Sequence, residues 1–232
     1  MIDGKDAQFM AEKQNVVVIG SSGHAKVVVD IIEKEGRYAI AGLIDTFKPV
    51  GEMVYGYKVL GSEEFLPTLM ANGGVYGGVI AIGDNWARSV IAEKIHSLAP
   101  EFIFITVIHP AAVVGRGVNI GAGTVLMAGA IVNSDSRVGE FCILNTGCSL
   151  DHDSLMGDYS SLAPGAAAGG NVTIGRFTAV SIGAHITHGI SIGEHTVLGA
   201  GALALKNIPD HCVAYGIPAN VIRKRNEGER YL

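Results

Sequence analysis

The sequence predicts two joined folds: an α/β unit of the Rossmann type, and an all-β parallel β-helix with a C-terminal cap. From Val114 to Ala204, a large aliphatic or small apolar residue recurs at every sixth position without interruption. From Val16 to Val107, short apolar runs instead alternate with stretches of helical period. Hexapeptide periodicity is typical of a parallel β-helix, and strands alternating with helices are typical of a parallel sheet covered on both faces.

Each hexad indicates one short strand followed by one corner. Two positions before the aliphatic lead stands a second, mostly small residue, as Cys142 stands before Leu144, which predicts a strand that buries one face. Gly, Asn or Asp often follows the lead, and these residues tolerate the backbone of a tight corner. Three hexads make a coil of 18 residues, so residues 18 apart should stack at about 4.8 Å.

Composition restricts the function classes. The chain has 232 residues, a net charge of -5 and a pI near 5.9, which argues against a general nucleic-acid surface. No apolar stretch approaches the roughly 18 residues of a membrane span, so we expect no membrane insertion. Three cysteines without metal spacing predict buried thiols at Cys142 and Cys148. The odd cysteine count and the lack of a signal peptide predict a cytoplasmic protein.

The first half of the chain divides into a leader and an α/β unit. Residues 1–15 are polar and aperiodic and predict a leader, followed by an α/β unit over 16–108. Val16 to Ile19 predict a buried strand that the turn Gly20-Ser21-Ser22-Gly23 joins to a helix. Further strands are expected over 38–44, 79–82 and 102–107, and further helices over 62–70 and 86–98.

Ligands of such sheets collect outside the carboxyl ends of the strands. The residues at those ends are Ser22, Gly23, His24, Asp45, Thr46 and Gly83. The glycine turn also opens onto a helix N-terminus, which favours an anion such as a phosphate. The turn is not GxGxxG, so a tight turn without a ligand is the alternative.

The chemistry is expected at one corner of the β-helix over 109–206. His152 lies between Asp151 and Asp153, and an imidazole beside a carboxylate can act as a general base. Gly170 follows three hexads later, so its N–H should lie one coil above and could meet an oxyanion. Asn145 lies one corner earlier. The alternative is a solvated polar turn.

The remaining corner histidines and the C-terminus have simpler interpretations. His188 follows His152 by two coils, about 10 Å along the same edge, which is too far for one zinc ion to bind both. We expect His185, His188 and His195 to be exposed corner residues. Residues 207–232 leave the hexad register and should form the cap and tail. The basic run Arg223-Lys224-Arg225 suits phosphate groups or is a solvated tail.

Several motifs together resemble the sialic-acid O-acyltransferase-like family, which includes N-acetyltransferases of nucleotide-linked 4-amino-deoxysugars. They extend from about Val16 to Arg223 and are Gly20-Ser21-Ser22-Gly23-His24-Ala25-Lys26-Val27-Val28, Ile82-Gly83-Asp84-Asn85, Leu144-Asn145-Thr146-Gly147, Asp151-His152-Asp153, Ala163-Pro164-Gly165-Ala166 and Gly216-Ile217-Pro218-Ala219. The resemblance implies a left-handed β-helix that forms a homotrimer, with acetyl-CoA at each subunit interface and the nucleotide sugar on the N-terminal sheet.

The resemblance also implies residue roles. His152 would be the base, Asp153 would hold it, and Asn145 would support the substrate pocket. The nucleotide sugar would contact Ser22, Gly23, His24, Asp45, Thr46 and Gly83, and acetyl-CoA would contact Ser161, Ile182 and Ala200. Many relatives carry His at the position of Ser161 and two acidic residues at the position of Asp45-Thr46, so these contacts should differ here.

The sequence therefore predicts an acetyl-CoA-dependent N-acetyltransferase that acts on the 4-amino group of a UDP- or GDP-linked amino-deoxysugar for bacterial surface glycan synthesis. Transfer would be direct, with no metal and no acyl-enzyme. The alternative is an O-acetyltransferase of a sialic-acid-type sugar. A zinc lyase of the γ-carbonic-anhydrase type, with zinc held between subunits by His152 and the later histidines, and a non-catalytic scaffold are further alternatives.

Overall fold

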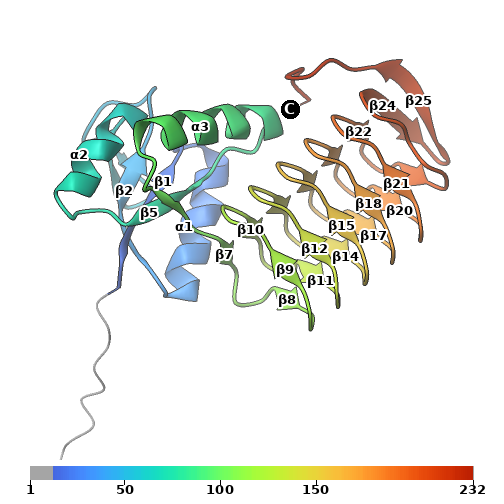
Figure 1. The fold of residues 1–232 in the computed structure, drawn as a ribbon, viewed down its shortest axis with the longest axis horizontal. Coiled ribbons are helices and arrows are strands. Elements are labelled where there is room, and N and C mark those ends of the chain that lie inside the picture. The colour runs from blue at the N-terminus through green and yellow to red at the C-terminus, as the bar shows by residue number, and fades with distance from the viewer. Residues whose placement is uncertain (1–12, 232) are drawn as a thin grey trace, which may run out of the picture.

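The computed structural model describes residues 13–231, and most of the expected leader lies outside these residues. An N-terminal α/β unit leads directly into a long β-helix, and a C-terminal hairpin closes the far end (Figure 1). The left-handed parallel β-helix joined to a Rossmann-like unit is the fold class that the sequence predicts.

The N-terminal sheet has the strand order β3-β4-β2-β1-β5-β6. Its strands are β1 (Asn15–Ile19), β2 (Ala39–Ile44), β3 (Met53–Val54), β4 (Tyr57–Gly61), β5 (Gly77–Ile80) and β6 (Ile103–Phe104). All neighbours are parallel except β3 and β4, which form an antiparallel hairpin that the sequence did not indicate. The chain reverses its direction across the sheet between β1 and β5, which makes this pair the switch point where ligands of such sheets bind.

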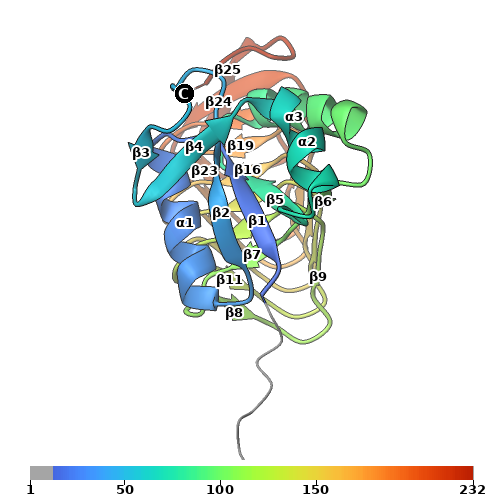
Figure 2. The same ribbon diagram turned by 90° about the vertical axis from the view of Figure 1, so that its left-hand side faces the viewer.

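Helices cover both faces of this sheet, as expected (Figure 2). Helix α1 (Gly23–Glu35) lies on one face, while α2 (Leu66–Ala71), after a 3-10 turn at Glu63–Phe65, and α3 (Asn85–Leu98) lie on the other. In β1, Val16 and Val18 pack with α1, and Val17 and Ile19 pack with α3. The alternation explains why the strand is apolar at consecutive positions.

The expected strand over 102–107 is in fact two strands of different sheets. After β6, the chain turns at Thr106, whose hydroxyl donates to the Gly121 carbonyl at 2.8 Å. The next strand, β7 (Val107–Ile108), then pairs with β10 of the β-helix. The sequence missed this break because the apolar run continues through it.

The β-helix has three parallel sheets. The first contains β7, β10 (Val125–Leu126), β13 (Ile143–Leu144), β16 (Ser161–Leu162), β19 (Ala179–Val180) and β22 (Val197–Leu198). The second contains β8 (Val113–Val114), β11 (Ile131–Val132), β14 (Ser149–Leu150), β17 (Ala167–Ala168), β20 (His185–Ile186) and β23 (Leu203–Ala204). The third contains β9 (Asn119–Ile120), β12 (Arg137–Val138), β15 (Leu155–Met156), β18 (Thr173–Ile174) and β21 (Ser191–Ile192).

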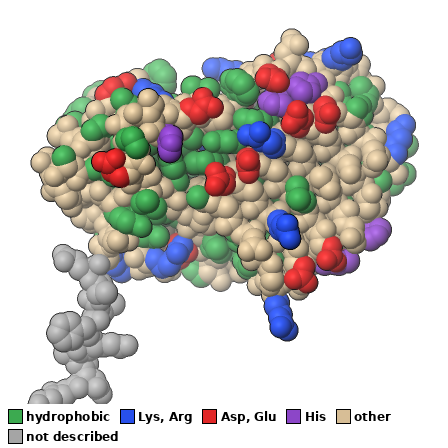
Figure 3. All heavy atoms as spheres, viewed as in Figure 1, with side chains coloured by type: hydrophobic (Ala, Val, Ile, Leu, Met, Phe, Trp, Pro, Cys, Tyr) green, Lys and Arg blue, Asp and Glu red, His purple; other side chains and the backbone are tan. Residues whose placement is uncertain are grey.

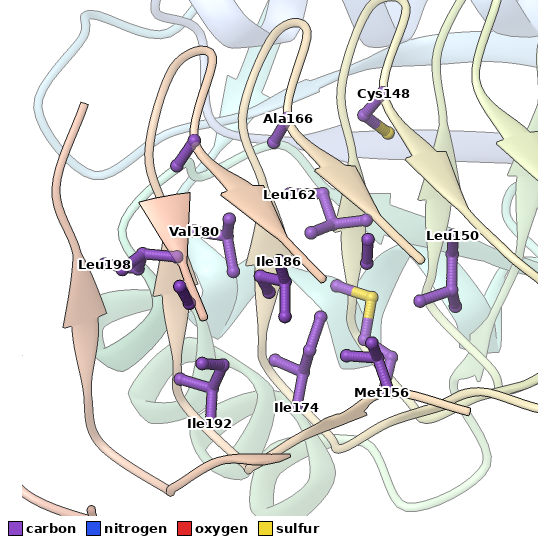
Figure 4. Close-up of a cluster of buried hydrophobic side chains, with 14 of the residues drawn as sticks. Cys148, Leu150, Met156, Leu162, Ala166, Ile174, Val180, Ile186, Ile192 and Leu198 are labelled. Carbon is purple, nitrogen blue, oxygen red and sulfur yellow. The ribbon is translucent and has the colours of Figure 1, made fainter. Parts of the chain in front are cut away.

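The expected coil of three hexads is confirmed by the pairing of Leu126 with Leu144 and of Leu144 with Leu162. Figure 4 shows lead and small side chains directed into the interior, where they form one continuous apolar core. The early lead Val114 is 41% exposed, because it lies in the first coil. Polar side chains among the small inward-facing residues form hydrogen bonds. The Ser136 hydroxyl, for example, donates to the Asp151 carbonyl and accepts from the Ser154 N–H.

A ladder of aromatic rings fastens α3 to the β-helix. Phe141, Tyr159, Phe177 and His195 lie at successive corners, one coil apart, with ring centroids separated by 4.9, 5.1 and 4.6 Å. Trp86 of α3 packs on Phe177 at 5.5 Å. The N-terminal unit is therefore held in a defined place beside the coils.

The C-terminal cap is a hairpin of β24 (Cys212–Gly216) and β25 (Ala219–Lys224), of which β24 pairs with β22. Acidic and basic side chains are interspersed on the face drawn in Figure 3. Within residues 13–231, the helices are too short or too polar to cross a bilayer.

Candidate active site

The structure brings His152, Asp153 and Gly170 together at one corner between the second and third β-helix sheets. His152 Nδ1 lies 2.8 Å from Asp153 Oδ2, and its imidazole is half-exposed. A β-carbon built on Gly170 would lie only 2.6 Å from His152 Nε2, so the Gly170 backbone rests against the ring. Among the hydrogen bonds of the described residues, none uses the Gly170 N–H.

Hydrogen bonds define the electrostatics of this corner. The bond to Asp153 raises the pKa of His152, since it favours the charged imidazolium. Asp151 accepts from the His152 N–H at 2.8 Å and from Asn133 Nδ2 at 2.7 Å, and these bonds lower its pKa. The arrangement holds Nδ1 on the carboxylate and leaves Nε2 to exchange a proton.

A cavity of about 250 Å³ lies where the N-terminal unit meets the first β-helix sheet. Of the residues expected to bind ligands, it is lined by His24, Gly83, Asn145, Ser161, Ile182 and Ala200. These residues follow the carboxyl ends of β1 and β5 or lie on or just after four successive strands of the first β-helix sheet, β13, β16, β19 and β22. His24 and Gly83, which are expected to contact the nucleotide sugar, thus line the same cavity as Ser161, Ile182 and Ala200, which are expected to contact acetyl-CoA.

His24 is neutral in this cavity. Burial, together with the nearby Arg88 guanidinium, lowers the pKa of His24 to about 4. Its Nε2 is buried and has no hydrogen-bond partner among the described residues. A neutral imidazole with a free buried nitrogen is suited to hydrogen-bond a polar ligand.

The remaining residues expected to bind the nucleotide lie along the same sheet edge. Ser22 occupies the N-cap of α1 without a side-chain capping bond, and Gly23 begins the helix. Asp45 accepts from the Ser21 hydroxyl at 2.5 Å, and the Thr46 hydroxyl donates to Glu63 Oε2 at 2.8 Å. The same Glu63 oxygen accepts from Lys94 Nζ at 2.8 Å, so the buried carboxylate of the 3-10 turn holds Thr46 and Lys94 together.

Three further residues, which the sequence analysis did not single out, contact residues expected to bind ligand. The buried Glu63 is one, through its bond with Thr46. Arg88 is another, and its fully buried guanidinium donates to the Ile82 carbonyl at 2.9 Å and the Phe141 carbonyl at 2.8 Å. Tyr231 of the tail lines the cavity and is the third. In the sequence, these residues do not lie at a regular interval from the motifs. For Arg88, the available signal was a charged residue within the apolar stretch of a predicted helix.

His152 and the cavity lie on different edges of the β-helix. Asn145 occupies the corner between the first and second sheets, and the strand β14 separates it from the His152 corner. Asn145 is therefore placed with His24 and Ser161 rather than with the base. Within one chain, the base does not line the cavity.

The expectation of exposed corner histidines holds for His185 and His188 and is wrong for His195. His195 is 7% exposed, because it continues the aromatic ladder. His195, His211 and Glu227 offer ligand atoms within 4.8 Å of one another. The two imidazoles are nearly parallel, at 21°, so their in-plane lone pairs do not converge on one metal ion.

Cys142 and Cys148 are buried, as expected. Burial raises the pKa of Cys142 to about 11 and that of Cys148 to about 12. Both thiols remain protonated at neutral pH and are unsuited to nucleophilic catalysis.

A hexapeptide-repeat β-helix that carries a carboxylate-paired histidine and shares a cavity with a Rossmann-like unit is typical of an acyltransferase of the hexapeptide-repeat class. The family model for the PglD N-terminal domain matches residues 15–95. UDP-N-acetylbacillosamine N-acetyltransferase of Bacillus subtilis (strain 168) is 35% identical over 121 residues, which are 50% of this chain and 52% of that protein. The aligned region thus spans about half the length of this curated relative.

Solved structures match along almost their whole length. PerB of Caulobacter crescentus, in complex with CoA and GDP-perosamine, is 35% identical with a TM-score of 0.83, covering 90% of this chain and 97% of that chain. The acetyltransferase domain of PglB from Neisseria gonorrhoeae, in complex with acetyl coenzyme A, is 32% identical with a TM-score of 0.84, covering 91% and 100%. The chain belongs to the N-acetyltransferase family of nucleotide-linked amino sugars. The main prediction of an N-acetyltransferase is confirmed at this level, and the O-acetyl alternative gains no support.

Proposed function

We propose that the chain transfers the acetyl group of acetyl-CoA to the 4-amino group of a UDP- or GDP-linked amino-deoxysugar, for bacterial surface glycan synthesis. The His152 corner is the observation that carries this proposal, because it combines an oriented imidazole with a neighbouring backbone donor. The names of the relatives support the substrate class, since they pair CoA with GDP-perosamine and name a UDP-linked amino sugar.

In the proposed reaction, the amine nitrogen attacks the thioester carbonyl while His152 Nε2 accepts a proton from that nitrogen. Asp153 stabilises the imidazolium, and the Gly170 N–H donates to the oxyanion. The intermediate then expels the CoA sulfur, which receives the proton from His152. The new amide bond and free CoA are the products, so no acyl-enzyme is required.

The site requires more than one subunit. His152 and the cavity lie on different edges of one β-helix. We infer a homotrimer in which the His152 edge of one subunit faces the cavity of its neighbour. Asn145, Ser161, Ile182 and Ala200 would then hold acetyl-CoA and the sugar opposite the base.

A thiol-release assay tests the activity. Acetyl-CoA is supplied with UDP-, GDP- or dTDP-linked 4-amino-deoxysugars, and sialic acid serves as the O-acetyl control. We expect CoA release with one UDP- or GDP-linked amino sugar, and its loss in His152→Ala. Release with sialic acid alone, or full activity in His152→Ala, would contradict the proposal.

Co-expression tests the shared site. His152→Ala lacks the base, and Ala200→Trp fills the cavity, so each variant alone should be inactive. Mixed trimers contain interfaces with an intact base opposite an intact cavity and should regain activity. Inactive mixed trimers would place the base and the cavity within one subunit.

A further inference from the structure

The C-terminal tail, residues 225–231, turns back from the cap toward the N-terminal unit. Arg225 is 6% exposed and donates to the His195 carbonyl at 2.9 Å and to the Glu229 carbonyl. The Glu229 carboxylate also pairs with Arg223 at 2.7 Å. These contacts close a tight loop, and Figure 1 shows that the tail then ends beside the start of α3.

Tyr231 connects the two units at this point. Its ring packs on Ala179, Val197 and Val213 of the first β-helix sheet. Its hydroxyl accepts from the Asn85 N–H at 3.2 Å and donates to the Gly83 carbonyl at 3.5 Å. Burial raises the pKa of Tyr231, which keeps the phenol neutral. The ring is therefore placed by contacts on both sides.

Tyr231 also separates two adjoining cavities. One is the cavity with Ser161 and Ile182 described above. The other, of about 520 Å³, lies toward the cap and is lined by Arg223, Arg225 and Arg230. Ser181, Ala200 and Tyr231 belong to both cavities. A largely apolar chamber thus adjoins a basic one, with Tyr231 in the wall between them.

We propose that the tail completes the acetyl-CoA site, with Tyr231 as the wall that contacts the pantetheine arm and Arg230 as the cation that meets the phosphates. The inference rests on the proposed function. Acyl-CoA carries an uncharged arm at its acyl end and phosphates at its other end, which matches the order of the two chambers. Arg223 is paired with Glu229 and Arg225 with backbone carbonyls, so the phosphate contact is assigned to Arg230.

Calorimetric titration of the full-length protein with acetyl-CoA tests this assignment. Loss of the ring in Tyr231→Ala should raise Kd by about tenfold, the effect of losing a well-buried apolar contact. Tyr231→Phe keeps the ring and should bind within about threefold of the wild type. Tyr76→Ala, which removes an exposed tyrosine outside both chambers, should bind as the wild type does.

Arg230→Gln tests the phosphate end, and its acetyl-CoA affinity should fall and become less sensitive to salt. If the wild type binds no acetyl-CoA, the proposed function itself fails. If the wild type binds and Tyr231→Ala binds equally well with only a lower melting temperature, the tail is merely a structural strap and the inference is overturned. An equal loss in Tyr231→Phe and Tyr231→Ala would overturn the assignment to the ring.

Discussion

The backbone of Gly170 lies directly against the imidazole of His152, which belongs to the preceding coil. A β-carbon at position 170 would come within 2.6 Å of His152 Nε2 and 2.7 Å of Cε1. Because one coil consists of three hexads, this contact follows from the sequence interval between the two residues. Only glycine permits the imidazole to occupy this position.

Gly170→Ala should therefore displace the imidazole while leaving the fold intact, since the half-exposed ring can move toward solvent. We expect turnover to fall by about 10² to 10⁴, the usual contribution of a positioned base, with little change in melting temperature. Gly189→Ala is the control, because nothing lies within 4 Å of the added carbon. Its positive φ of 70° adds backbone strain, so it should lower stability at least as much as Gly170→Ala while keeping turnover. Full turnover in Gly170→Ala would show that His152 does not take part in the reaction.

Asp153→Asn should shift the pH profile. His152 must be neutral to accept a proton. Because Asp153 raises the pKa of His152, His152 becomes protonated at a higher pH than an ordinary histidine does. The acidic limb of the activity profile should therefore lie at a correspondingly higher pH. Removing the carboxylate lowers this pKa, so the acidic limb of kcat/KM should move to lower pH while the maximal rate falls. The measurement is a pH-rate profile of both proteins; an unmoved limb would show that His152 does not control it.

Arg88→Met should destabilise the protein. The guanidinium satisfies the carbonyls of Ile82, Gly83, Phe141 and Tyr159, which join α3 to the coils. Leaving several of them unpaired should cost about 3 kcal/mol or more. Urea unfolding measures this loss, and Arg37→Met, at a half-exposed guanidinium, should cost less than about 1 kcal/mol. Equal effects of the two variants would contradict the role of Arg88.

His24 should make the fold sensitive to mild acid. Its pKa is lowered from 6.5 to about 4 in the folded protein, so between these values the unfolded chain binds a proton that the folded chain does not. Folding stability must then fall as the pH falls from 6.5 toward 4, by up to about 3 kcal/mol for this group. Urea unfolding at a series of pH values should show a shallower decline for His24→Gln. Parallel declines would indicate that His24 titrates normally.

The β-helix is the part of the fold that the sequence predicted in detail. Each hexad repeats the same pattern of strand and corner residues. Residues three hexads apart in the sequence therefore stack on each other in the structure, as His152 and Gly170 do. The aromatic ladder was not predicted, although Phe141, Tyr159 and Phe177 follow one another at this interval. The β3–β4 hairpin and the break at Thr106 were not predicted, because short strands and continuous apolar runs carry no distinctive period.

The sequence by itself determined the coils, the corner with His152, Asp153 and Gly170, and the strand ends that carry His24 and Asp45. These features depend on local periodicity and a fixed stacking interval. Only the tertiary structure brought Arg88, Glu63 and Tyr231 into contact with the residues expected to bind ligand, and only it separated His152 from the cavity. Such contacts join segments far apart in the chain, and they are decided by how the two units pack on each other.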